Sequence, residues 1–270
     1  MKKLQAVSIA SLIFMAAPLH AGVALDMVTR DAFGNTIEAM KVYAQSGKIR
    51  MDGVGQPADE RMSMIFLGQE FLVLDHSDQK YIVVDADMIA AVGSQMEAAM
   101  RQMEAQLADM PPEQRAMVEE MMRGQMQGMT GGDPQDRIAP RVEETGAGEW
   151  ESSPCTQYVV YEGEEKTQEI CAAPLADIQG VGEAMEAFTN MAGFMNQLSE
   201  SMPEPMASAM AENPMELIDQ IDGFPVRRVD FVNGRVHSET ILEGVVEQAL
   251  DANVFAVPEG YTEQDLFAGQ

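Results

Sequence analysis

Methionine is concentrated in two short stretches of this 270-residue chain, and these stretches constrain the fold most strongly. Seventeen of the 24 methionines lie there, ten from Met88 to Met129 and seven from Met185 to Met215. Methionine is a flexible, polarizable apolar residue, common on helix faces that adapt to varied ligands. The two stretches therefore predict helices whose apolar faces either complete a core or line a binding site.

The first stretch has the periodicity of a helical hairpin. Within residues 89–110, apolar residues recur at alternating spacings of three and four, which makes one stripe along a helix. Pro111 and Pro112 end this helix and begin a second one, which runs to the sequence GGDP. We expect the Met-rich helical hairpin to span residues 86–129 and a polar loop, rich in glycine and charge, to span residues 130–149.

Residues 23–85 have instead the pattern of an antiparallel meander. Glycines and polar segments separate six β-rich runs, at Val23–Thr29, Thr36–Ala44, Lys48–Asp52, Arg61–Leu67, Glu70–Leu74 and Lys80–Val84. The runs Phe71–Leu74 and Tyr81–Val84 are apolar at every position, whereas a strand with one solvated face alternates. Both faces of that last hairpin must therefore be covered.

The C-terminal half adds helices and strands. Helices are predicted at 176–198 and 203–221, and strands at Phe224–Val232 and Arg235–Glu243 are joined by the strong turn signal Asn233–Gly234. The order of elements predicts a single α+β domain over residues 22–270. In it, one curved antiparallel sheet, shared by both chain ends, is covered by the Met-rich helices.

The chain has two cysteines, Cys155 and Cys171, in β-rich runs on either side of a Glu-Gly-Glu turn. If the hairpin pairs Tyr161 with Glu165, the same register places Cys155 opposite Cys171. We therefore expect a structural disulfide. A redox-active pair is the alternative, but it lacks C-x-x-C spacing and a helix N-terminus.

The N-terminus has the pattern of an export signal. Lys2 and Lys3 precede the apolar run Ala6–Ala17, which is too short to span a bilayer and ends on LHA. We expect residues 1–21 to be a signal peptide cleaved near Ala21, which makes the protein periplasmic; an uncleaved anchor is the alternative. No later apolar stretch is long enough to cross a membrane, so stable membrane insertion is not expected.

The formal net charge of the chain is −27, and loss of the signal peptide removes two lysines more. Nucleic acids and anionic lipid surfaces are bound by clustered lysine and arginine. The charge therefore argues against nucleic acid as a partner, and we attribute it to solubility.

No residue constellation predicts catalysis. After signal removal the histidines are His76 and His237, and neither lies beside a Ser-Gly or Cys motif. His76, Ser77 and Asp78 are triad residue types, but adjacent side chains in a turn do not align as base, nucleophile and orienting group. We expect no enzyme activity and no cofactor.

Copper is the alternative ligand, because thioether sulfur suits Cu(I). The candidate ligands are Met117, Met121 and Met122, which lie at helical spacing in the second half of the hairpin. The same spacing is what a core stripe requires, and neither Met-rich stretch contains histidine. Copper binding is therefore the alternative to an apolar site.

Several sequence segments resemble a known family. GKIRMDG, MSMIFLGQEFLVLDHSDQKYIVVD, the Met-rich MEAQLADMPPEQRAMVEEMM, a Cys-x-x-Tyr strand with ICAAPL, GFPVRRVDF and VFAVPEGY occur in this order. Together they resemble the exported bacterial family called domain of unknown function 4412, whose activity is uncharacterised.

A more distant resemblance involves the chain end. The meander and the ending D-x-x-x-F-x-x-P-x-G, at Asp251, Phe255, Pro258 and Gly260, are similar to the periplasmic carriers that bring lipoproteins to the outer membrane. This resemblance implies an unclosed β-barrel with helices as a lid over an apolar cavity. Transfer of the carrier function rests on analogy alone.

These observations predict a non-enzymatic binding or carrier-like protein with an apolar site between sheet and helices. Its ligand is lipid-like or an apolar segment of a partner. The expected lining residues are Phe66, Phe71, Val73, Tyr81, Val83, Met96, Met100 and Met103. The alternative is that the methionine helices complete the core and no ligand binds.

Overall fold

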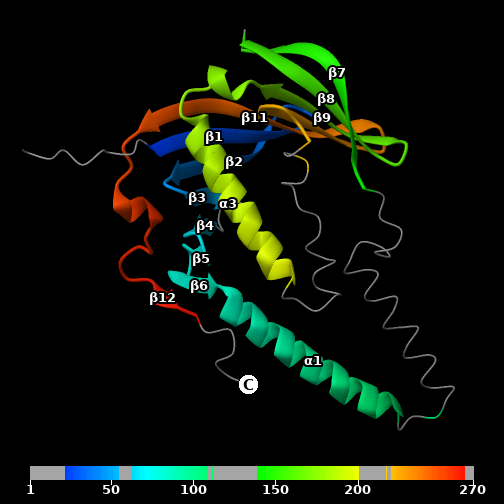
Figure 1. Ribbon diagram of the computed structural model, residues 1–270, viewed down its shortest axis with the longest axis vertical. Helices are drawn as coiled ribbons and strands as arrows, with labels where there is room; N and C mark the ends of the chain where they lie inside the picture. The colour runs from blue at the N-terminus through cyan, green and yellow to red at the C-terminus, as the bar shows by residue number, and fades with distance from the viewer. Residues whose placement is uncertain are drawn as a thin grey trace, which may run out of the picture.

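A computed structural model describes residues 22–54, 62–108, 111, 139–151, 153–200, 217 and 220–264. A single large sheet dominates this part of the chain (Figure 1). Its strands are β1 Gly22–Asp31, β2 Thr36–Gln45, β3 Lys48–Val54, β4 Met62–Phe66, β5 Phe71–Asp75, β6 Lys80–Val84, β7 Arg141–Trp150, β8 Ser153–Glu162, β9 Glu165–Ala173, β10 Phe224–Val232, β11 Arg235–Gln248 and β12 Thr262–Glu263. The α-helices among the described residues are α1 Ala86–Ala108 and α3 Val181–Glu200, and the short 3-10 helices are η2 Leu175–Asp177 and η3 Ala252–Phe255.

The sheet has twelve strands in the order β12-β6-β5-β4-β3-β2-β1-β11-β10-β9-β8-β7. Every neighbouring pair is antiparallel except β12 and β6, which are parallel. The first strand, β1, pairs with β11 in the middle of the sheet, so segments far apart in the sequence are neighbours there. The edge strands β12 and β7 do not pair with each other, so the sheet is open.

The predicted fold class is wrong. We expected an α+β domain in which Met-rich helices cover a curved antiparallel sheet, and the resemblance to lipoprotein carriers implied an unclosed barrel. The structure is instead nearly all sheet, of mixed type, with two α-helices in the described part. Methionine periodicity overestimated the helical layer because it does not reveal whether a helix packs on the sheet.

The expected strands of residues 22–84 and 224–248 are confirmed, because glycine and polar turns punctuate both segments. At the turn between β10 and β11, Asn233 and Gly234 adopt φ angles of 52° and 70°, as a tight hairpin requires. Gly180, just before α3, has φ of 81°, and a Cβ atom there would lie 3.2 Å from a methyl of Val23. This close approach brings the start of α3 onto β1.

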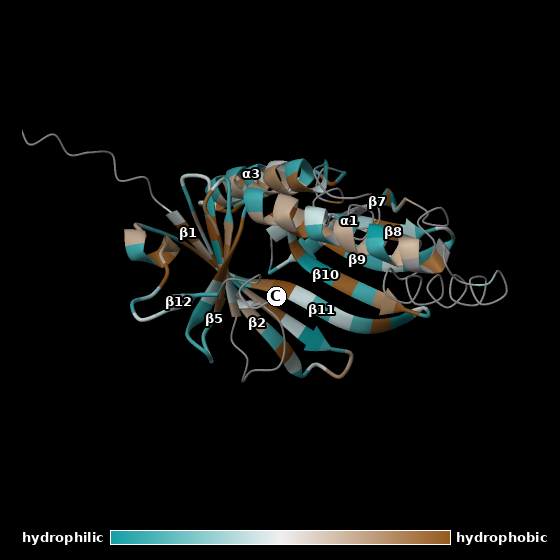
Figure 2. Cartoon of the chain, turned by 90° about the horizontal axis from the view of Figure 1, so that it is seen from below, coloured by the Kyte–Doolittle hydropathy of each residue, from teal (hydrophilic) through white to brown (hydrophobic). Residues whose placement is uncertain are grey.

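Helix α3 lies against one face of the sheet, and the sheet curves around it (Figure 2). Its buried residues are Val181, Ala184, Ala187, Phe194 and Leu198. They join a core cluster with strand residues such as Val23, Val42, Ile49 and Phe66, all of which are inaccessible to solvent. We call this the α3 face of the sheet.

The part of the chain after β11, which we call the C-terminal segment, covers part of the opposite face of the sheet. Phe255 of η3 is buried against Ile65, Leu72 and Leu74. Tyr81 and Val83 of β6 pack around the same cluster. The expectation that both faces of this hairpin are covered is confirmed for β5, which has Phe194 of α3 on one side and Phe255 on the other. All residues of β6 are half-buried.

Within the described part of the chain, helix α1 contacts the sheet and core mainly through its first two turns. Asp85 caps the helix by accepting a hydrogen bond from the backbone N–H of Met88 at 2.8 Å, and Ile89 is buried in the core. From residue 94 to residue 105, every side chain that the structure describes is exposed. The helix leads away from the end of β6 (Figure 1). We expected this first half of the predicted hairpin to cover the sheet, and its described side chains between residues 94 and 105 do not.

Two further sequence predictions need correction. The polar loop expected at 130–149 is wrong for residues 141–149, which belong to the edge strand β7. The second half of the predicted helical hairpin and most of the helix expected at 203–221 lie outside the described residues. The register of the cysteine hairpin is also shifted, because Glu162 pairs with Glu165 and Gln157 lies opposite Cys171.

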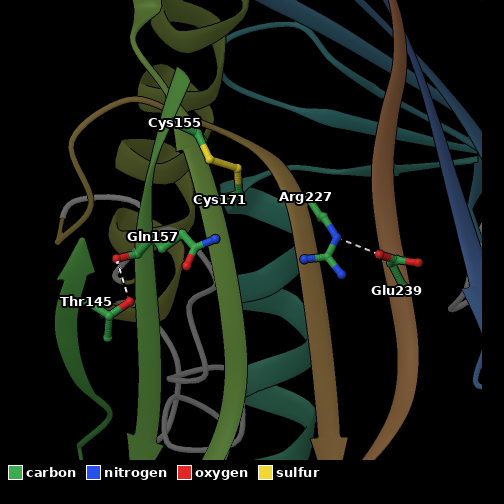
Figure 3. Close-up of a disulfide and its surroundings, with 6 residues drawn as sticks. All are labelled: Thr145, Cys155, Gln157, Cys171, Arg227 and Glu239. Atoms are coloured by element: carbon green, nitrogen blue, oxygen red, sulfur yellow. Dashed lines mark hydrogen bonds and ion pairs between the residues drawn. A yellow bond between two sulfur atoms is a disulfide. The ribbon is translucent and has the colours of Figure 1, made fainter. Parts of the chain in front are cut away.

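The disulfide between Cys155 and Cys171 is nevertheless present, so the predicted pairing is confirmed (Figure 3). A register shift between Val160 and Tyr161 moves the two cysteines into diagonal positions on β8 and β9. Their Cα atoms are 5.6 Å apart, within the range that a disulfide spans. The bond therefore ties β8 to β9 near the end of the hairpin.

Candidate functional site: the methionine rim

A continuous apolar row crosses the α3 face of the sheet. Leu25, Val42, Met51, Met64 and Val73 are direct partners on five successive strands, β1 to β5. Direct partners in a ladder point to the same face, so the five side chains form one row. Leu25 and Val42 are fully buried, whereas the three residues that follow are half-buried.

The partly buried methionines on this face form a group of their own. Met27 and Met40 are direct partners one step along from that row, and α3 and the first turn of α1 supply four more. All pack against the α3 core cluster and keep part of their surface accessible. This set, which we call the methionine rim, is Met27, Met40, Met51, Met64, Met88, Met185, Met191 and Met195.

Phe194 fixes α3 on this face. Its ring centroid lies 5.7 Å from that of Phe66 and 5.6 Å from that of Phe71, and the two strand rings are 5.1 Å apart. Such tilted ring contacts stabilise packing beyond the area that they bury. The rim methionines pack against the core cluster that contains these rings, so the face combines rigid aromatic packing with adaptable side chains.

The structure distributes the predicted lining residues over two faces and a helix. Phe66 and Phe71 lie together beneath α3, and Val73 continues the apolar row beside them. Tyr81 and Val83 belong to the opposite face, under the C-terminal segment.

Of the three predicted lining methionines of α1, the structure describes only the side chain of Met103. Met103 is 40% exposed. Met96 and Met100 lie on the same helix, and their side chains are outside the described part of the chain. The alternative copper ligands Met117, Met121 and Met122 lie outside the described residues as well.

Helical periodicity, on which the predicted site rests, does not identify the methionines of the strands. Met27 and Met40 both occupy alternate positions in strands, where apolar residues mark a buried face. Met51 and Met64 lie in equally clear strands. The strand alternation was the signal that could have identified these four residues.

A polar network on the opposite face resembles a serine and histidine dyad. The Ser63 hydroxyl lies 2.6 Å from His76 Nε2 and 2.5 Å from Asp52 Oδ1, and His76 Nδ1 lies 2.6 Å from the Tyr261 hydroxyl. Asp52 also forms an ion pair with Arg50 at 2.7 Å. His76 is next to Ser77 and Asp78 in the sequence, but its hydrogen-bond partners in the structure are distant in sequence.

The direction of these hydrogen bonds argues against nucleophilic catalysis. Asp52 is a carboxylate in its ion pair and only accepts, so the single hydroxyl proton of Ser63 points toward it. Ser63 Oγ must then accept a hydrogen bond from the N–H at His76 Nε2, whereas a catalytic serine donates its hydrogen bond to the histidine. Ser63 is also 1% exposed, so we interpret the network as a bridge between the sheet and the C-terminal segment.

The described part of the chain contains no group of three or more His, Cys, Asp or Glu side chains that could hold a metal ion. None of its helices is both long and apolar enough to cross a membrane. A small cavity of about 80 Å³ lies beside the disulfide, where Thr145, Gln157, Glu169 and Arg227 contribute polar groups. The guanidinium of Arg227 is ion-paired with Glu239 at 2.6 Å (Figure 3).

Comparisons with known proteins do not identify a family. No protein-family model and no curated protein matches the chain. An uncharacterized conserved protein from Thermus thermophilus is similar in structure, with a TM-score of 0.43, 8% identity, and 91% of each chain covered. PNGF-II is similar with a TM-score of 0.36 and 9% identity over 91% of this chain, which spans 31% of the PNGF-II chain. Both TM-scores are too low to carry an argument about fold or function.

Proposed function

We propose that this protein is a non-enzymatic binding protein whose methionine rim holds a lipid-like ligand or an apolar segment of a partner. The observation that carries the proposal is the partial burial of eight methionines contributed by both the sheet and the helices. Methionine side chains adopt many shapes at little packing cost, so a border of them accommodates an apolar chain without a preformed cavity.

The location of the protein is part of this proposal. The disulfide Cys155–Cys171 fits an oxidising compartment outside the cytoplasm. Together with the predicted signal peptide over residues 1–21, it supports a periplasmic location. Membership of the domain of unknown function 4412 family stays a prediction that rests on the sequence segments named above.

Copper binding through Met117, Met121 and Met122 is the second candidate, and no observation in the described residues favours it over the apolar site. The alternative without any ligand makes a different prediction. In that case the rim methionines serve packing alone, and an apolar probe finds no site on the protein.

The experiment is a titration of the full-length protein with a fluorescent fatty acid. Met64 and Met62 lie two residues apart on β4, but Met64 is half-buried on the rim and Met62 is 38% exposed. We expect wild type to bind the probe and Met64→Gln to weaken binding roughly tenfold, because an apolar ligand there desolvates an amide at a cost of about 1–3 kcal/mol.

The controls separate binding from folding. Met62→Gln makes the same chemical change outside the rim and should leave the affinity unchanged. Met64→Leu conserves volume and apolarity, so it should bind as wild type does. A wild-type protein that is folded but binds no apolar probe would contradict the proposal and favour the packing alternative.

A further inference from the structure

We propose that a polar patch beside the methionine rim binds the head group of a zwitterionic phospholipid that carries a primary ammonium group. The inference rests on the proposed function, because the acyl chains of such a lipid occupy the rim. The polar patch consists of Thr29 on β1, Gln168 on β9, Arg228 and Asp230 on β10, and Ser238 and Thr240 on β11.

The strand register places these six side chains on one face. Thr29 pairs with Thr240, and Thr240 pairs with Arg228. One step further along the strands, Ser238 pairs with Asp230, and Asp230 pairs with Gln168. Direct partners share a face, and so do residues two apart on a regular strand, so the two rows form one patch.

The patch continues directly from the methionine rim. Met27 and Leu242 are direct partners on β1 and β11, and each lies two residues from a patch threonine. The hydroxyls of those threonines, Thr29 and Thr240, are 3.0 Å apart. On the other side of the patch, Gln168 pairs with Val160, which belongs to a second buried apolar cluster. The α3 face therefore changes from apolar to polar and back again.

One group in the patch requires a hydrogen-bond donor. The side-chain oxygen Oε1 of Gln168 is buried and has no hydrogen-bond partner. A buried acceptor without a partner is destabilising, and natural proteins rarely retain one. A ligand donor at this position resolves the cost.

Charges of both signs lie beside this oxygen. Asp230, the strand partner of Gln168, accepts a hydrogen bond from Ser238 at 3.0 Å and forms an ion pair with Arg228 Nε at 3.2 Å. The Arg228 side chain is 45% exposed, and a guanidinium has donors on both terminal nitrogens as well as on Nε. The patch thus offers acceptors and a negative charge at one end and a cationic donor group at the other.

A zwitterionic head with an ammonium group matches this arrangement. Its N–H groups donate to Gln168 Oε1 and the Asp230 carboxylate, while its phosphate accepts from the Arg228 guanidinium. A choline head has no N–H and leaves the Gln168 oxygen unpaired. An anionic head without an ammonium group, such as that of phosphatidylglycerol, brings no cation to Asp230.

The test compares phosphatidylethanolamine and phosphatidylcholine that carry the same fluorescent acyl chain, each titrated into the full-length protein. We expect wild type to bind phosphatidylethanolamine at least about tenfold more tightly, since one charge-assisted hydrogen bond is worth about that factor. Gln168→Leu should reduce this preference by weakening the binding of phosphatidylethanolamine alone, because the hydrogen bond to Asp230 remains. Arg228→Gln should lower the affinity for both lipids about tenfold, because both head groups carry the phosphate.

Arg227→Gln is the matched control, because Arg227 is the neighbour of Arg228 on β10, has a similar exposure of 43%, and is ion-paired with Glu239. Successive side chains of a strand lie on opposite faces, so Arg227 lies on the face opposite the polar patch. Its substitution should leave the affinities for both lipids unchanged. Gln168→Leu should also raise the urea midpoint of the lipid-free protein, because it removes the unpaired acceptor. This opposite effect on folding and on binding distinguishes a ligand site from a structural role.

Equal affinity for the two lipids, together with unchanged binding in Gln168→Leu, would overturn the head-group site and leave the proposed function standing. Failure of the protein to bind either phospholipid or a fatty acid would overturn the proposed function and this inference with it. A choline preference in wild type would also overturn the head-group assignment.

Discussion

The hydroxyl of Ser63 is an example of a single residue whose role is set by the direction of its hydrogen bonds. It donates to Asp52 and accepts from His76, and it is 1% exposed. Residue types alone suggest a catalytic dyad here. The ion pair between Arg50 and Asp52 reverses the polarity, because it keeps the acceptor charged.

Ser63→Ala is expected to destabilise the protein by about 1–3 kcal/mol, because it leaves the Asp52 oxygen and the His76 N–H without a partner. Urea unfolding measures this loss. The control is Ser94→Ala on the exposed part of α1, which should change stability by less than about 0.5 kcal/mol. An ester hydrolase activity that Ser63→Ala abolishes at unchanged stability would contradict the structural role.

At the scale of elements, sequence patterns identified most strands but misjudged the helices. The strands before residue 85 have glycine or polar turns at each end, so their limits are visible locally. Strand β7 was missed because its sequence, RVEETGAGEW, is mostly polar, with exposed residues at alternate positions along an edge. Its pairing with β8 is a tertiary interaction that the local pattern does not contain.

The apolar character of the site could be predicted from the sequence, but the residues that form it could not. The apolar sequence of β5 correctly predicted cover on both faces, but the cover comes from Phe194 of α3 and from Phe255. The stripe on α1 has the same spacing whether or not a helix packs on a sheet. Sequence spacing therefore defines an apolar face, whereas the chain topology decides what lies against it.

The C-terminal segment should contribute strongly to the stability of the folded protein. Phe255 is 7% exposed, whereas Phe33 in the turn after β1 is 91% exposed. We expect Phe255→Ala to cost about 3–5 kcal/mol, because it opens a cavity over Ile65 and Leu74. Phe33→Ala should cost less than about 0.5 kcal/mol. Equal urea midpoints for the two variants would show that the C-terminal segment is not part of the folded core.

The pairing of β12 with β6 should depend on alkaline pH. A hydrogen bond to Glu263, 3.1 Å long, raises the pKa of Tyr81, and partial burial and the charge of Glu263 act in the same direction. Because the pKa is raised in the folded state, this contribution to stability is complete below the unfolded value of about 10 and is lost as the pH rises through the folded pKa. The edge pairing should therefore loosen in strong alkali.

Absorbance titration of the tyrosines tests this expectation. The difference between wild type and Tyr81→Phe isolates the Tyr81 hydroxyl from the other tyrosines. In a Glu263→Gln background, the same difference curve should move to lower pH, because the carboxylate acceptor is gone. Coincident difference curves would mean that Glu263 does not hold the Tyr81 proton.

At the scale of the whole molecule, the two faces of the sheet have different roles. The C-terminal segment closes one face, where Phe255 is buried in an apolar cluster and the buried Ser63 is hydrogen-bonded to His76. The α3 face combines half-buried methionines with the unpaired oxygen of Gln168. The α3 face also holds the larger core cluster, so the features that suit a ligand lie at the border of that core.

The most direct test of this account is NMR spectroscopy of the protein labelled with carbon-13 at its methionine methyl groups, assigned by single substitutions and titrated with a fatty acid. We predict that the methyl signals of the rim, such as Met51, Met64 and Met191, shift and saturate together. The signals of the exposed Met62 and Met103 should stay in place. Rim signals that do not move, or shifts confined to Met62 and Met103, would contradict an apolar binding site on the α3 face.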